Sequence, residues 1–228
     1  MKKRELKNLL YEQVARIGRA VASPRRLELL ELLAQGEKTV ETLAQELSVD
    51  IKLTSAHLKA LREARLVATR RNGKHVVYRL SGSDVADLWV RLREVAETHL
   101  LEMGAALAQI AAHPAELTPT SRKALLDRAR RGEVVLIDVR PKAEYDTAHL
   151  PHARSMPLSE LERRMTELPK DREVVAYCRG PFCLLADEAL KLLARRGYRA
   201  RKITDGVSEW RAAGLRLDTS LAAAGGVA

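Results

Sequence analysis

The stretch EVVAYCRGPFCLLADEALKLLARRG, residues 173–197, decides the fold of the second half of this chain. It begins with a continuous apolar run, which is typical of a strand buried in a parallel sheet, and it ends in a helical pattern. Between the two lies a short loop bounded by Cys178 and Cys183, the only two cysteines in 228 residues. This order predicts an α/β unit with Cys178 at the carboxyl end of a strand, where open α/β sheets bind ligands.

The segments on both sides of this stretch repeat the alternation of strand and helix. Strand patterns fall at residues 133–139, 173–178 and 198–203, and helical patterns fall at 121–132, 141–149, 158–168 and 183–197. Continuous apolar strands that alternate with helices are typical of a parallel sheet buried between helical layers. We therefore predict an α/β domain with a parallel sheet over the second half of the chain.

The first half of the chain is helical by pattern, apart from one hairpin. Helical patterns cover residues 5–21, 23–36 and 39–47, another helix starts after Asp50, and a long one runs over about 83–111; two β patterns at 66–71 and 75–80 are joined by Asn72-Gly73. Asn-Gly is the strongest short-range hairpin signal. Pro114 and Pro119 then break the pattern. We expect a multidomain protein, with a mainly α winged helix-turn-helix domain at 1–112 and the α/β domain at 113–228.

The composition is that of an ordinary globular protein, with 46% hydrophobic and 31% charged residues. No apolar run approaches the roughly 20 residues of a membrane span, and the basic start lacks the apolar core of a secretory signal. We therefore expect a cytoplasmic protein without membrane contact, in which thiols stay reduced. The net charge of +10 divides evenly, because residues 1–113 hold 19 Lys+Arg against 14 Asp+Glu and the remainder holds 21 against 16. The net charge therefore does not show which half of the chain would bind DNA.

Local clustering of cations does distinguish the first half. In winged helix-turn-helix folds the second helix of the motif enters the major groove with its N-terminal residues against base edges. We predict that the inward face of this helix carries Ile51, Leu53, His57 or Leu58, and Leu61. The predicted DNA contacts are Lys52, Thr54, Ser55, His57, Lys59 and Arg62 on the helix, and Arg70, Arg71 and Lys74 in the wing, where a phosphate backbone would lie. An alternative interpretation makes His57 a packed residue of the helix-turn-helix core.

Residues 23–81 resemble the ArsR family of bacterial winged-helix repressors. The likeness is carried by residues 55–61, 64–67 and 73–78, although Arg65 stands where the family usually has glycine. It extends over about residues 15–105. The resemblance implies a homodimer formed through the first and last long helices, and it implies binding of an imperfect palindrome in double-stranded DNA near a promoter.

Many members of this family sense metals, which require a set of ligands in the sequence. The cysteine pair that typical metal-sensing members carry is absent from residues 39–47, the matching helix. On the last long helix of this half, His99 and Glu102 stand three positions apart, and two ligands do not make a metal site. We expect no metal and no other cofactor.

The two cysteines of the second half leave several kinds of chemistry open. A structural zinc site wants four ligands, and redox dithiols more often have two intervening residues than four. Both thiols could also be small buried residues at a strand–helix junction. Inward N–H groups of the loop and the helix start would instead activate a thiol. Lowering its pKa from about 8.5 to about 6.5 raises the thiolate fraction at pH 7 from roughly 3% to roughly 75%. We predict that Cys178 is the more acidic thiol, because it lies at the centre of these groups.

The second half also resembles the rhodanese family of sulfurtransferases, over about residues 117–216. The matching pieces are Asp138-Val139-Arg140, Glu144-Tyr145, His149-Leu150-Pro151, the Cys178 loop, and Gly206 with Trp210. The resemblance implies that Cys178 takes a sulfane sulfur from a donor such as thiosulfate or polysulfide and passes it on from a persulfide. It also implies a loop that holds the persulfide and the donor anion, formed by Arg179, Gly180, Pro181, Phe182 and Cys183. Asp138 and Arg140 are expected to brace the fold beneath the site.

Cys183 departs from the family pattern, in which serine, threonine or another polar residue is common at this place. Two roles stay open for it: it could cap the following helix, or it could attack a persulfide on Cys178 and trap the sulfur as a disulfide or polysulfide bridge. The fusion of the two domains leads us to predict a transcriptional repressor that senses or transfers reactive sulfur. The alternatives are a sulfurtransferase enzyme with an independent autoregulatory DNA-binding domain, and a catalytically idle rhodanese module that recruits a partner.

Overall fold

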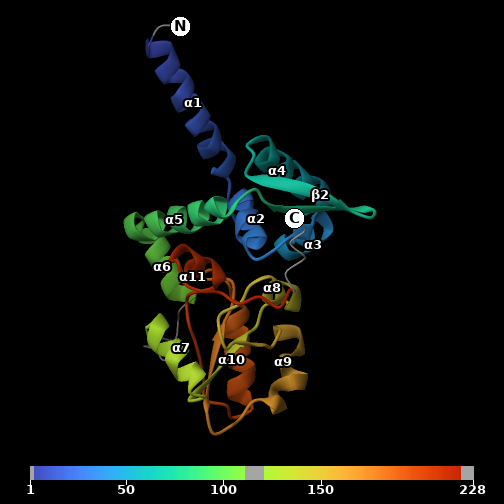
Figure 1. Cartoon of the computed structure of the whole chain (residues 1–228), viewed down its shortest axis with the longest axis vertical. Coiled ribbons are helices and arrows are strands. Elements are labelled where there is room, and N and C mark those ends of the chain that lie inside the picture. The colour runs from blue at the N-terminus through green and yellow to red at the C-terminus, as the bar shows by residue number, and fades with distance from the viewer. Residues whose placement is uncertain (1–2, 111–120, 222–228) are drawn as a thin grey trace, which may run out of the picture. The chain divides into compact units, whose positions relative to one another are not determined.

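The computed structural model describes residues 3–110 and 121–221, which form two compact units, Met1–Trp89 and Val90–Ala228 (Figure 1). The division between the units falls inside helix α5 (Ser83–His99). The boundary predicted near residue 112 lies outside the described residues. Within the described ranges, none of the helices has both the length and the apolar character needed to cross a membrane.

The first unit is helical and contains one small antiparallel sheet. Its elements are α1 (Lys3–Val21), α2 (Pro24–Ala34), β1 (Lys38–Thr39), α3 (Val40–Leu47), α4 (Ile51–Glu63), β2 (Val67–Asn72), β3 (His75–Leu80) and the first part of α5. The sheet order is β1-β3-β2, and β2 and β3 form the predicted hairpin, with Asn72 opposite His75. Gly73 closes the turn with a φ of 59°, a conformation that glycine adopts without strain.

The core of the first unit is built from leucines of three helices. Leu29 of α2, Leu43 of α3 and Leu58 of α4 are fully buried, and they belong to one apolar cluster. Val67 brings the hairpin onto the same cluster, and Val85 brings the start of α5 onto it. The predicted winged helix-turn-helix fold is thereby confirmed, because the helices and the hairpin share a single core.

The single helix predicted over residues 83–111 is two helices in the structure. α5 ends at His99, and α6 (Leu101–Ile110) begins two residues later. The Leu100 carbonyl accepts hydrogen bonds from the N–H groups of both Met103, at 3.0 Å, and Gly104, at 3.4 Å. Such shared bonds are common at helix ends, so α6 starts with its own first turn instead of extending α5.

The second unit has the predicted α/β fold with a parallel sheet. From the end of α5 onward its elements are α6, α7 (Arg122–Arg130), β4 (Val134–Asp138), α8 (Lys142–Thr147), β5 (Arg154–Ser155), α9 (Leu158–Arg164), the short 3-10 helix η2 (Met165–Glu167), β6 (Glu173–Tyr177), α10 (Leu185–Arg195), β7 (Ala200–Lys202) and α11 (Val207–Ala212). The strand order is β5-β4-β6-β7, and each neighbouring pair is parallel. β4 and β6 are therefore the central strands.

Helices cover the sheet of the second unit on both faces, so β4 and β6 direct buried apolar side chains to both faces. One face packs on α9 and α10, where Ile137 meets Leu161 and Leu190 in one cluster. The opposite face packs on α7 and α11 in a second cluster that includes Leu125 and Trp210 (Figure 1). This double coverage explains the continuous apolar runs in the sequence.

Candidate functional site

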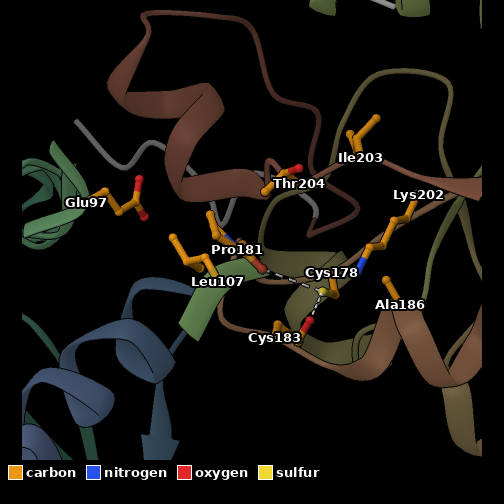
Figure 2. A pocket seen from close by; sticks show the side chains of 10 residues that line it. Glu97, Leu107, Cys178, Pro181, Cys183, Ala186, Lys202, Ile203 and Thr204 are labelled. Carbon is orange, nitrogen blue, oxygen red and sulfur yellow. Dashed lines mark hydrogen bonds between the residues drawn. The ribbon is translucent and has the colours of Figure 1, made fainter. Parts of the chain in front are cut away.

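Cys178 follows directly after β6, at the carboxyl end of a central strand. Its side chain is buried, with 4% exposure. The thiol donates hydrogen bonds to two backbone carbonyls of the loop, that of Cys183 at 3.2 Å and that of Gly180 at 3.9 Å (Figure 2). Gly180 has a φ of 150°, which side chains rarely allow. The loop thus closes around the sulfur, and it needs glycine at this position to do so.

A pocket of about 130 Å³ lies beside the Cys178 thiol. Apolar groups of four segments line it, namely Leu107 of α6, Pro181 of the loop, Ala186 of α10 and Ile203 after β7. Glu97 of α5, Lys202 of β7 and Thr204 add polar groups (Figure 2). All of these residues belong to the second unit. This volume is below the range of about 300–1,000 Å³ for pockets that hold drug-sized ligands, so the pocket suits a smaller molecule.

Two cations beside the loop are each paired with a carboxylate. The Arg179 Nη2 atom lies 2.6 Å from Glu144 Oε1, and the Glu144 side chain is buried. Lys202 of the pocket wall pairs with Asp187 of α10. The charges of both cations are therefore largely compensated before any anion enters the pocket.

The two thiols perturb each other's ionisation. The hydrogen bond with Cys183 and burial raise the pKa of the Cys178 thiol well above its usual value, and the amides of Ala186 and Gly180 oppose this only in part. The hydrogen bond with Cys178 lowers the pKa of Cys183 to about 7. The amides of Arg179 and Leu185 and the Arg179 charge act in the same direction on Cys183.

The prediction that Cys178 is the more acidic thiol is wrong for the reduced protein. Backbone amides of the loop region are divided between the two sulfurs instead of converging on Cys178. The Cys178 thiol also faces two carbonyl oxygens, which stabilise its protonated form. The negative charge of the pair therefore resides mainly on Cys183.

One role left open for Cys183 was capping of the following helix, α10. The N-cap position of α10 belongs to Leu184 instead, which makes no side-chain capping bond.

Asp138 and Arg140 form a fully buried ion pair at the end of β4. The Arg140 Nη2 atom lies 2.6 Å from Asp138 Oδ2 and also donates to the Ala148 carbonyl at 2.8 Å. The pair therefore fixes the turn that follows α8, and neither side chain lines the pocket. This geometry agrees with a bracing role.

Sequence reasoning missed the pocket residues Glu97 and Leu107, as well as Lys202. Glu97 and Leu107 belong to the helical pattern that was assigned to the other domain, and no local signal links them to a loop far along the chain. Lys202 stands inside a strand pattern, where a buried lysine is recognised only once its partner Asp187 is known. Among residues 3–110 and 121–221, no three His, Cys, Asp or Glu side chains gather where they could hold a metal ion.

The helix predicted to contact DNA bases is α4. In its first turn, the residue that faces the core is not the one that was predicted. Leu58 and Leu61 point inward as expected, but Thr54 takes the third inward position with 0% exposure. Its hydroxyl donates to the Asp50 carbonyl at 3.0 Å. Ile51 and Leu53, which were expected inside, are 48% and 50% exposed. Thr54 has no surface to offer a base, so its prediction as a DNA contact is wrong.

The other predicted DNA contacts keep accessible side chains. Lys52, Lys59 and Arg62 are exposed along α4, Ser55 and His57 are half-buried there, and Arg70, Arg71 and Lys74 are exposed in the wing. Within the wing, Arg70 is engaged already, since its Nε atom lies 2.6 Å from Glu37 Oε2. A row of cations along α4 and at the hairpin tip is the distribution that phosphate contacts require.

Two family models match the chain. The model described as a rhodanese-like domain matches residues 121–213, which contain the Cys178 loop. The model described as bacterial regulatory protein, arsR family, matches residues 23–69, which contain α2 to α4. The two matches fall in the two halves for which the sequence predicted these folds.

Several known proteins resemble the chain. The HTH-type transcriptional regulator Rv0324 of Mycobacterium tuberculosis is 42% identical over 212 residues, which cover 93% of each chain. A sulfurtransferase of Allochromatium vinosum is 36% identical over 84 residues, 36% of this chain and 77% of its own. Among solved structures, the homodimeric winged helix-turn-helix DNA-binding domain of a possible ArsR-family regulator from Mycobacterium bovis is 43% identical, with a TM-score of 0.41 over 45% of this chain and 93% of that one.

The likeness to the M. tuberculosis regulator spans nearly the whole of both chains. The domain matches agree with the folds of the two units. The chain therefore belongs to the ArsR family of DNA-binding transcriptional regulators, and it carries a rhodanese-like domain in its second half.

Proposed function

We propose that this regulator is a repressor whose rhodanese-like domain takes up reactive sulfur as a persulfide on Cys178. The observation that carries the proposal is the pair of Cys178 and Cys183, in which the Cys178 thiol donates to the Cys183 carbonyl beside a small pocket at the carboxyl end of β6. A pair of this kind supplies a nucleophile together with a group that takes its proton. Its presence in a DNA-binding chain suggests that sulfur chemistry controls transcription.

Uptake of sulfur begins with removal of the Cys178 proton. Cys183, with a pKa of about 7, is about half ionised at neutral pH, and its thiolate accepts this proton. The Cys178 thiolate then attacks the outer sulfur of a persulfide donor, R–S–SH. The bond between the donor's two sulfurs breaks as the new S–S bond forms, and R–S⁻ leaves and takes the proton held by Cys183. One sulfur atom moves without a separate oxidant.

The lining of the pocket favours a donor of low charge. Leu107, Pro181 and Ile203 offer apolar surface, and Lys202 is already paired with Asp187. Glu97 brings a carboxylate to the wall. Thiosulfate carries two negative charges, which this wall compensates poorly. We infer that organic persulfides and short polysulfides are better donors than thiosulfate.

Cys183 can also react with the Cys178 persulfide. Its thiolate attacks the inner sulfur of the Cys178 persulfide, which releases HS⁻ and leaves a disulfide between the two cysteines. A plain disulfide requires Cβ atoms about 3.5–4.5 Å apart. A longer polysulfide donor leaves two added sulfur atoms on Cys178. The Cys183 thiolate then attacks the first of them, the terminal sulfur leaves as HS⁻, and a trisulfide bridge with a looser distance requirement remains. We propose that this bridge is the signal state.

The first unit supports a homodimer that binds duplex DNA. α1 exposes Leu6, Leu10, Tyr11 and Val14, a series of apolar side chains at helical spacing. A second copy would cover this face, as the family resemblance implies, and two α4 helices would then meet two half-sites of an imperfect palindrome. A repressor of this kind acts in the cytoplasm, where its thiols stay reduced.

Mass spectrometry of the full-length protein after treatment with an organic persulfide tests the chemical part of this proposal. We expect a mass increase of one sulfur on Cys178, transfer of that sulfur to cyanide, and loss of both in Cys178→Ser. Cys183→Ser should still load Cys178, more slowly. Absence of sulfur on either cysteine would favour an idle module that recruits a partner, and labelling confined to Cys183 would contradict the assignment of the nucleophile.

A further inference from the structure

Arg93 of α5 is a buried cation that joins two carboxylates next to the Cys178 loop. Its side chain is 4% exposed. The Nη1 atom lies 2.7 Å from Glu209 Oε1 of α11, and the Nε atom lies 3.0 Å from Glu97 Oε1, one turn along α5. The guanidinium also lies over the ring of Phe182 in the loop, 5.8 Å from its centre. All four residues belong to the second unit.

Glu209 links the Arg93 guanidinium to the backbone of the Cys178 loop. The Oε2 atom of its carboxylate accepts the N–H of Gly206 at 2.7 Å. The same atom lies so close to Gly180 that a Cβ added there would stand only 3.0 Å away. Gly206 in turn abuts the loop, because its added Cβ would lie 2.6 Å from the Cys178 carbonyl oxygen. Loop, carboxylate and guanidinium are therefore packed without a gap.

Buried charges make this arrangement sensitive to displacement. Arg93 and Glu209 are both at least 95% buried, so each depends on the other for compensation. A shift of Gly180 or Phe182 moves the carboxylate or the ring that holds the guanidinium. Because water does not reach the pair, it cannot replace a lost contact. The Arg93 guanidinium therefore moves with the loop.

Sulfur on Cys178 would cause such a shift. In the reduced protein the Cys178 thiol donates to the carbonyls of Gly180 and Cys183. A persulfide moves the terminal S–H outward by one bond, so both carbonyls lose this donor. The loop then loses the contact that closes it around the sulfur.

We propose, on the basis of the persulfide chemistry proposed above, that Arg93 is a positioning residue that ties the Cys178 loop to helix α5. Through Glu209 and Phe182 it holds the loop in the conformation that reacts, and it passes the loop's rearrangement to α5. α5 is continuous from Ser83 to His99, and its first part belongs to the DNA-binding unit. Arg93 is thus the residue of this helix that pairs with Glu209 and lies over Phe182.

The test compares full-length wild type with Arg93→Gln, Arg93→Lys and the control Arg91→Gln. Arg91 is an exposed arginine of the same helix that pairs with Glu94. Two properties are measured, namely the kinetics of sulfur transfer from an organic persulfide to cyanide, and the amide hydrogen exchange of residues 90–99 before and after loading. Loading is confirmed by mass.

We expect Arg93→Gln to lower kcat about 10- to 100-fold with KM changed less than about threefold, because the loop is misplaced while the pocket remains. Arg93→Lys, which keeps the charge, should recover part of kcat, and Arg91→Gln should stay within about twofold of wild type. Loading of wild type should change exchange in residues 90–99 at least about fivefold, the low end of typical coupling, and Arg93→Gln should abolish this response.

An unchanged exchange pattern in wild type with sulfur confirmed on Cys178 would overturn the inference, and so would wild-type kinetics in Arg93→Gln. Should Arg93→Gln not fold, the wild-type exchange response and the kinetics of Arg93→Lys still decide. If the wild-type protein takes up no sulfur, the proposed function fails and the inference falls with it. Failure of the inference alone is recognised by normal loading of Cys178 without a response in α5.

Discussion

Replacing Cys178 with alanine should raise the pKa of Cys183. The hydrogen bond from Cys178 is the largest of the interactions that lower this pKa to about 7, and burial acts in the opposite direction. Alanine removes the donor and leaves the burial. The pKa of Cys183 should therefore return to the ordinary value of about 8.5 or above. The amides of Arg179 and Leu185 remain in place, so the size of the shift reports the contribution of Cys178 itself.

The pH profile reveals this change better than a single rate. At pH 7 a thiol with a pKa of about 7 is half ionised, and one with a pKa of about 8.5 is about 3% ionised, roughly a 15-fold loss of thiolate. The more basic thiolate is about fivefold more nucleophilic, given a Brønsted coefficient of about 0.4–0.5, so the rate at pH 7 falls only about threefold. The midpoint of the profile, however, moves by about 1.5 pH units.

Alkylation of Cys183 with iodoacetamide, followed by mass spectrometry between pH 5 and pH 10, measures this midpoint. Reactivity should be lost as pH falls through about 7 in wild type, and through about 8.5 or above in Cys178→Ala. Unfolded protein provides the unperturbed reference. A midpoint that stays near 7 in Cys178→Ala would refute the reasoning, since Arg179 and the amides would then suffice to stabilise the thiolate.

Three further changes test other parts of the structure. Affinity for duplex DNA should fall about 10³–10⁵-fold between 50 and 200 mM salt if a dimer contacts six to ten phosphates, and Lys59→Ala or Arg71→Ala should weaken binding to all sequences alike in fluorescence anisotropy. Thr54→Val should leave base preference unchanged and cost at most about 1 kcal/mol in chemical denaturation, because the lost hydroxyl only bonds Asp50. Asp138→Asn should destabilise the second unit by about 3–5 kcal/mol, since it leaves Arg140 buried without its charged partner; a change below 1 kcal/mol would contradict the bracing role.

The positions of the main elements could be predicted from the sequence because local patterns report them directly. The apolar run before Cys178 indicates a buried strand, and Asn72-Gly73 indicates the hairpin. The rotation of α4 could not be predicted from hydrophobicity alone. Thr54 enters the core in place of Leu53, because the Asp50 carbonyl satisfies its hydroxyl within the helix and removes the cost of burying it.

The chemistry of the site was harder to predict than its location. Cys178 is placed by the strand pattern, but its pKa depends on whether carbonyls or amides point at the sulfur, and a sequence does not record this. Arg93 and Glu97 look like ordinary charged positions of an amphipathic helix. Their contacts with α11 and with the pocket become apparent only when segments distant in the chain are folded together.

The central claim is that sulfur chemistry at Cys178 controls DNA binding, and one titration tests it most directly. Duplex DNA from the promoter of the chain's own gene is titrated with full-length protein, either reduced or loaded with polysulfide, in wild type and in Cys183→Ser. We predict that loading weakens wild-type binding about 5- to 150-fold, the usual range for linked sites, and that Cys183→Ser loads sulfur but, without the bridge, loses most of this response. Equal affinity of reduced and loaded wild-type protein, with sulfur confirmed on Cys178, would show that the two domains act independently.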